Sequence, residues 1–191
     1  MFTAARHLAG ILLLCSALAL PAGAETYDID PTHTYASFEI DHLGFSTQRG
    51  QFNRSRDSLR YDPVQQQGEV DIHIDAASLD TGLAARDDIL RGEDWFNVAA
   101  NPDILFRSTA FVFDGPRLTA IDGRLTLLGQ SRPLRLDIQR VKCGLNFVSR
   151  KRGCGADATA TLHRSDFGLN NGLPFIGDEV RLRIQVEAYA P

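Results

Sequence analysis

Residues 179–188 read E-V-R-L-R-I-Q-V-E-A, in which apolar and polar residues alternate without interruption. Successive side chains of a β-strand point to opposite faces, so this stretch predicts a strand with one buried face and one solvated face. The same alternation recurs at 36–41, 69–74, 134–139 and 158–163. The half-buried strand is therefore the local structure that this sequence predicts most strongly.

Turn-forming Gly, Pro and Asp residues separate the alternating segments, and the connections between segments are short. About eight or nine strands in an antiparallel meander are predicted. The expected strands lie at 35–43, 47–54, 57–61, 68–75, 104–113, 117–128, 132–142, 156–166 and 178–189. Because each strand has one apolar face and no second layer of helices is expected, the sheet must fold on itself. We expect an all-β, antiparallel, eight-stranded barrel, with two packed sheets as the alternative.

One segment interrupts the meander. A short helix is expected over 83–91, with Thr81 as its N-terminal cap and Gly92 as its C-terminal stop. The apolar residues expected to face the sheet are Leu83, Ile89 and Leu90. Two adjacent aromatics, Trp95 and Phe96, follow the helix. This insertion suits either a cover over one mouth of the barrel or a plug that completes the core.

The interior of an eight-stranded barrel is just wide enough to be filled by side chains or to hold one small ligand. Small residues on the expected inner face leave volume, and these are Ala36, Ala110, Ala158 and Ala160. The phenylalanines expected to line it are Phe38, Phe45, Phe52, Phe106, Phe111, Phe113, Phe147, Phe167 and Phe175. Such a cavity suits a chain-like apolar ligand. A barrel filled by its own side chains is the alternative.

The beginning of the chain has the pattern of a cleaved secretory signal over 1–24. Arg6 lies in a short basic start, residues 8–20 are almost wholly apolar, and 22–24 form a small-residue cleavage site. The apolar run is shorter than the roughly 20 residues that span a membrane as a helix. We therefore expect a periplasmic protein with one domain, 25–191. A formal net charge of −4 argues against a nucleic-acid partner.

Cleavage removes Cys15 and leaves Cys143 and Cys154. In an exported protein an even pair of cysteines is most simply a disulfide, and the C-x-x-C spacing of redox and metal sites is absent. Basic residues surround the pair, namely Arg140, Lys142, Arg150, Lys151 and Arg152. We expect them to form a solvated loop, with a contact to anionic lipid head groups as the alternative.

The histidines differ in the face of the strand that they occupy. His42 continues the apolar side of its strand and is expected in the pocket or at its mouth, whereas His73 and His163 fall on polar sides. A metal site formed by His33 and His42 would need further ligands, and no spacing supports zinc. We therefore expect His42 to meet a ligand and no metal to be bound.

Arg86 and Arg164 are expected to point inward, where an arginine is unfavourable unless it is paired or meets an anion. One interpretation is a salt bridge, with Asp87, Asp88 or Asp166 as partner. The other is a phosphate or carbonyl head group at the mouth, bound together with His42. The sequence has no nucleophile elbow, paired-carboxylate motif or phosphate-binding glycine loop, so no enzymatic activity is expected.

Many short motifs in consistent order resemble the YceI-like family of polyisoprenoid-binding, lipocalin-like periplasmic proteins. They lie at 27–30 with His33, 38–46, 50–52, 79–82, 86–87, 90–91, 94–96, 101–102, Ile104, 106–108, 123–129, 164–168 and 177–180. The cysteine pair resembles that of a subset of the family. The resemblance implies an extended antiparallel barrel that holds a long isoprenoid or fatty chain without enzymatic activity, often as a dimer.

We therefore expect a carrier or buffer for a non-covalently bound polyisoprenoid, quinone-like lipid or fatty amide, with no other cofactor. The residues expected to contact the ligand are Phe38, His42, Phe45, Phe52, Arg86, Trp95, Phe96, Phe106 and Arg164. Transient membrane contact and a homodimer are further expectations. The alternative function is a structural or interaction protein of the periplasm, which could partner a membrane redox enzyme and would have a filled barrel.

Overall fold

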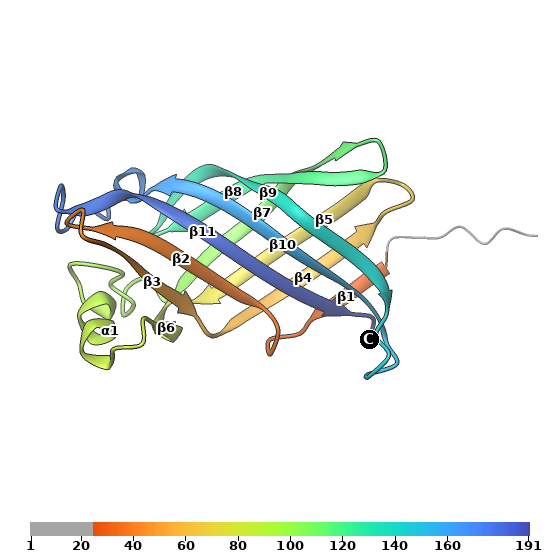
Figure 1. Cartoon of the computed structure of the whole chain (residues 1–191), viewed down its shortest axis with the longest axis horizontal. Helices are drawn as coiled ribbons and strands as arrows, with labels where there is room; N and C mark the ends of the chain where they lie inside the picture. The colour runs from red at the N-terminus through yellow and green to blue at the C-terminus, as the bar shows by residue number, and fades with distance from the viewer. Residues whose placement is uncertain (1–24) are drawn as a thin grey trace, which may run out of the picture.

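One antiparallel sheet wraps round into a closed barrel in the computed structural model, which describes residues 25–191 (Figure 1). Its strands are β1 (Glu25–Ile29), β2 (Tyr35–His42), β3 (Ser46–Phe52), β4 (Ser55–Asp62), β5 (Gln67–Asp75), β6 (Leu79–Asp80), β7 (Asp103–Asp114), β8 (Arg117–Leu127), β9 (Gln130–Leu145), β10 (Arg152–His163) and β11 (Ile176–Tyr189). The helical elements are η1 (Ala76–Ser78), α1 (Ala84–Arg91) and η2 (Arg164–Phe167). The signal peptide expected over 1–24 lies outside the described residues.

Three strands of the barrel wall are interrupted by a bend. Residues 30–34 separate β1 from β2, residues 53–54 separate β3 from β4, and η1 separates β5 from β6. The two halves of a bent strand pair with the same neighbouring strand. For example, β1 and β2 both pair with β11. Counting each bent strand once, the described residues form eight strands around the barrel. The predicted eight-stranded antiparallel barrel is confirmed, and two separate packed sheets are not formed.

Asp30 builds the bend between β1 and β2. Its Oδ1 accepts hydrogen bonds from the Thr32 hydroxyl at 2.6 Å and the Thr32 amide at 2.8 Å, and its Oδ2 lies 2.8 Å from His33 Nδ1. These bonds, led by the Thr32 hydroxyl, lower the pKa of Asp30 to about 2, and the carboxylate raises the pKa of His33. His33 is thus a bend residue. His33 precedes β2 and His42 ends it, and a strand of this length spans about 23 Å, so the two cannot share a metal.

The helix differs from its prediction at its N-terminus. Leu83 occupies the N-cap position, whereas the Thr81 hydroxyl donates to Asp87 Oδ1 at 2.5 Å and therefore does not cap the helix. Gly92 follows the last helical residue, as predicted. Leu90 packs against the core, but the expected inward placement of Leu83 is wrong because its side chain is exposed.

Local irregularities move several expected interior residues to the surface. A register shift between Ser108 and Ala110 reverses the alternation of β7, so Ala110 is exposed. The predicted interior position is wrong for three phenylalanines, which are exposed in turns or loops: Phe45, Phe147 and Phe175. Phe167 is part of the buried core but does not line the cavity inside the barrel. Turn geometry, which alternation does not reveal, decides these positions.

Cys143 and Cys154 are cross-strand partners on β9 and β10 and form a disulfide, as predicted. Closing a loop of this length stabilises the fold by about 2–3 kcal/mol, mainly through the unfolded state. The bond lies close to the tip of the hairpin formed by these strands, whose turn carries Phe147. Within residues 25–191, no helix is long and apolar enough to cross a membrane.

Candidate functional site

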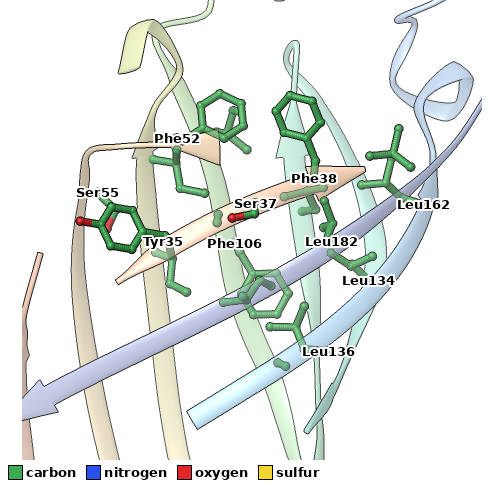
Figure 2. Close-up of a pocket in the computed structure, with 18 of the residues that line it drawn as sticks. Tyr35, Ser37, Phe38, Phe52, Ser55, Phe106, Leu134, Leu136, Leu162 and Leu182 are labelled. Carbon is green, nitrogen blue, oxygen red and sulfur yellow. The ribbon is translucent and has the colours of Figure 1, made fainter. Parts of the chain in front are cut away.

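The barrel encloses an apolar cavity of about 500 Å³, within the range of about 300–1,000 Å³ that is typical of small-molecule sites. Figure 2 shows side chains from different strands around this space, among them Phe38 of β2, Phe106 of β7 and Leu136 of β9. The walls extend from Cys154, at the disulfide, to Trp95, beyond the helix. The side chains of the described residues therefore do not fill the interior. The alternative function, that of an interaction protein, required a filled interior.

Small residues leave part of this volume free. Ala36 on β2 and Ala158 on β10 both lie in the cavity wall, as predicted. Ala158 is paired across the sheet with Ile138 and Ile184, which also line the cavity. A larger side chain at Ala158 would occupy the space between the walls. Ala160 is buried but lies outside the wall.

Aromatic side chains fasten the helical insertion to the barrel. The ring of Phe52 lies 6.0 Å from that of Phe38 and 5.6 Å from that of Phe96, the latter pair edge to face. Trp95 and Phe96 both form part of the cavity wall. The insertion therefore closes the side of the barrel where β3 pairs with β6 only at Gln51 and Phe52.

Gly50 permits this close packing on β3. A Cβ at this position would lie 2.5 Å from Phe38 Cζ and 2.9 Å from Thr81 Cγ2. Both contacts are closer than carbon atoms approach one another, so only glycine lets the aromatic wall and the start of the insertion meet here. The motif residue Gly50 is thus explained by packing.

Polar groups in the wall gather near α1, and we call this end of the cavity the mouth. They are His42, Gln48, Arg49, Thr81 and Arg86. Arg86 donates from Nε to Thr81 Oγ1 at 2.7 Å, from Nη1 to Gln48 Oε1 at 2.6 Å and from Nη2 to the Thr81 carbonyl at 2.7 Å. Because these are neutral acceptors, the predicted salt bridge of Arg86 to Asp87 or Asp88 is wrong.

Two features distinguish Arg86 from its neighbour Arg49. Arg49 forms an ion pair with Glu39 at 3.0 Å, whereas none of the ion pairs among the described residues includes Arg86. A guanidinium has five N–H donors. Within the protein, each of the three guanidinium nitrogens of Arg86 donates one hydrogen bond. Arg86 therefore retains charge and donors that an anionic or carbonyl head group could accept.

Arg164 is held differently. Its side chain is almost wholly buried at 1% exposure, and its guanidinium donates to the carbonyls of Gly177 at 2.8 Å, Leu169 at 2.5 Å and Ile176 at 2.9 Å. The guanidinium also lies 5.7 Å from the centre of the Trp95 ring. Burial lowers the pKa of Arg164, and the charge of Asp178 opposes that effect. The predicted ion pair with Asp166 is not formed, and Arg164 organises the loop before β11.

The expected contact residues converge on the cavity with one exception. The wall contains Phe38, His42, Phe52, Arg86, Trp95, Phe96, Phe106 and Arg164. Phe45 is exposed, because Leu43 and Gly44 adopt φ angles of +59° and +71° and carry the turn out of the barrel. His73 and His163 lie outside the cavity wall and contact Asp71 and Asp178 respectively.

Ser55, at the start of β4, is a wall residue that the sequence did not predict. Its hydroxyl is buried in the cavity wall and has no hydrogen-bond partner among the described residues. Buried hydroxyls are normally satisfied, so this oxygen is available to a polar group of a ligand. No alternation or motif marks this serine in the sequence. Within residues 25–191, no group of three or more His, Cys, Asp or Glu side chains is arranged to hold a metal ion.

Comparison with known proteins agrees with this architecture. Residues 27–188 match the YceI-like domain. A UPF0312 protein of Pectobacterium carotovorum is 32% identical over 181 residues, covering 94% of this chain and 93% of that protein.

Two solved structures have the same fold. BcnA of Burkholderia cenocepacia is similar with a TM-score of 0.70 and 22% identity, over 84% of this chain and 99% of that chain. A polyisoprenoid binding domain from Saccharophagus degradans has a TM-score of 0.65 and 17% identity, over 86% of this chain and 98% of that chain. Together with the sequence matches, the barrel shows that this chain belongs to the YceI-like domain family.

Proposed function

We propose that this protein binds the long apolar chain of a lipid inside its barrel and acts as a periplasmic carrier or buffer. The observation that carries this proposal is the apolar cavity of about 500 Å³, which no side chain of the described residues fills. A solved domain of the same fold is described as polyisoprenoid binding, which adds support. The ligand classes proposed are polyisoprenoids, quinone-like lipids and fatty amides. No reaction and no other cofactor are part of this proposal.

Transfer free energies favour exchange over permanent retention. Burial of an apolar chain stabilises it by about 0.8 kcal/mol per CH₂ group relative to water. In a bilayer the same chain is already out of water, so moving it into the barrel is close to balanced. Selectivity must then come from the head group and from the length of the cavity. A transient contact with the membrane belongs to this proposal, and a homodimer is compatible with it.

The direct test is mass spectrometry of lipids that co-purify with the protein from its own source. We expect a long-chain lipid near one molecule per barrel, extractable with organic solvent. The purified, delipidated protein should also keep an added polyprenol in solution. If no lipid is extracted and no polyprenol is solubilised, the proposed function is wrong.

Arg86 is expected to discriminate between head groups. An Arg86→Ala variant should bind a polyprenyl phosphate about tenfold or more weakly, because charged hydrogen bonds are worth about 1.5–3 kcal/mol. Binding of the corresponding polyprenol should change far less. The measurement is a pair of equilibrium titrations with the two lipids. Arg181→Ala, on the outside of β11 beside Glu179, is the matched control. Equal losses for phosphate and alcohol would contradict a head-group role.

A further inference from the structure

Two loops at the mouth expose large apolar side chains. The turn between β2 and β3 carries Leu43 at 47% exposure and Phe45 at 89%, and the loop before β11 carries Phe175 at 67%. A hydrogen bond of 2.8 Å from the Leu43 amide to the Phe175 carbonyl joins the two loops. We call Leu43, Phe45 and Phe175 the mouth rim. Leaving three such side chains in water is unfavourable, so the rim requires an explanation.

The rim is continuous with the cavity. His42 and Ile176, the neighbours of Leu43 and Phe175 in the chain, are cross-strand partners, and both line the cavity. Ile89 of α1 lines the cavity as well and is 63% exposed. Both loops lie at the same end of the barrel as α1 (Figure 1). Ile89 and Ile176 therefore connect the exposed rim with the interior.

The two loops also lack charge. Residues 42–48 and 167–177 contain no Lys, Arg, Asp or Glu, although charged residues make up 23% of the chain. Placing these loops among lipid head groups and acyl chains would desolvate no Lys, Arg, Asp or Glu side chain. The other aromatic loop tip, at Phe147, differs because Arg150, Lys151 and Arg152 follow it closely.

We infer that the mouth rim inserts into the surface of a lipid bilayer and places the mouth against the membrane while lipid is exchanged. This inference rests on the proposed function. A long apolar chain that left the mouth into water would lose the stabilisation of both barrel and bilayer, so transfer requires direct contact between the two. Apolar insertion without charge makes the contact independent of anionic lipid. The partner is therefore the bilayer itself, including one made only of zwitterionic lipid.

The test compares the two aromatic ends of the barrel. The rim variant is Phe45→Ser with Phe175→Ser, and the control is Phe147→Ser, at a site 87% exposed. Binding to phosphatidylcholine vesicles is measured by flotation at low and high salt, and transfer of a fluorescent polyprenol between vesicles is timed. We expect the rim variant to lose about tenfold or more in vesicle binding and transfer rate. The control should behave as the unmodified protein, with little effect of salt.

The content of co-purified lipid separates this inference from the proposed function. A rim variant that keeps its lipid but no longer binds vesicles supports the docking surface. Loss of vesicle binding in the Phe147 variant alone would overturn it. A second outcome would also overturn it: a protein that carries lipid, does not bind vesicles and forms a dimer that the rim substitutions dissociate. In that case the rim would contact a second copy of the chain. Vesicle binding through the rim by a protein that carries no lipid would overturn the proposed function alone.

Discussion

Replacing Arg164 by alanine is expected to lower the free energy of unfolding by about 3–5 kcal/mol. The side chain is 1% exposed and holds three backbone carbonyls, those of Leu169, Ile176 and Gly177. Truncation leaves these acceptors without their partner in a region that water reaches poorly, and it also opens a void beside Trp95. Urea denaturation of both proteins, followed by tryptophan fluorescence and circular dichroism, measures the difference.

Arg181→Ala is the matched control for this prediction. Arg181 forms an ion pair with Glu179 on the outside of β11, where its side chain is 66% exposed. Exposed pairs contribute about 0–1 kcal/mol, so this variant should remain near the stability of the unmodified protein. If Arg164→Ala does not fold, Arg164→Lys provides the measurement, because an ammonium group cannot match the planar geometry of three carbonyls. Equal stability of the Arg164→Lys and Arg181→Ala variants would contradict the structural role.

Ala158→Trp is expected to weaken binding of a long-chain polyprenol by about 100-fold or more while the barrel remains folded. Ala158 lies in the cavity wall between Ile138 and Ile184, so an indole at this position enters the space that an apolar chain would use. Large substitutions usually strain a packed core, but here a cavity of about 500 Å³ receives the added atoms. Titration with a fluorescent polyprenol measures the binding, and thermal unfolding measures the stability.

The neighbouring Thr159 provides the control, because successive residues of a strand face opposite sides of the sheet. Its hydroxyl accepts a hydrogen bond of 3.1 Å from Gln139, and it is not part of the cavity wall. Thr159→Trp should therefore leave polyprenol affinity unchanged. A polyprenol affinity that is the same in the two tryptophan variants would place the ligand outside the barrel.

Motifs that suggested the family have structural explanations in this barrel. Ser165 donates through its amide at 2.9 Å and its hydroxyl at 2.8 Å to the carboxylate of Asp178, which ties 164–168 to 177–180. Thr81 and Asp87 make the corresponding connection within the insertion. These motifs hold loops in place at the mouth. Their presence in the sequence therefore indicates the fold more directly than it indicates which side chains meet a ligand.

The pattern of the sequence was sufficient for the barrel, the inner face of most strands and the disulfide. Alternation in 179–188 or 158–163 depends only on the local geometry of a strand, so it survives without knowledge of the rest of the molecule. It placed Phe38, Phe52, Phe106 and Ala158 on the cavity side, where the structure has them.

Tertiary structure alone decided the features that depend on distant contacts. A bulge turned Ala110 outward, and left-handed turn residues carried Phe45 to the mouth rim. The partners of Arg164 became backbone carbonyls of the loop that follows it, not carboxylates. The free volume of the interior also has no local signal, because it depends on how many strands close the ring and which side chains then face one another. Periodicity thus determined which residues turn toward the inside, and chain closure determined how much of that inside stays empty.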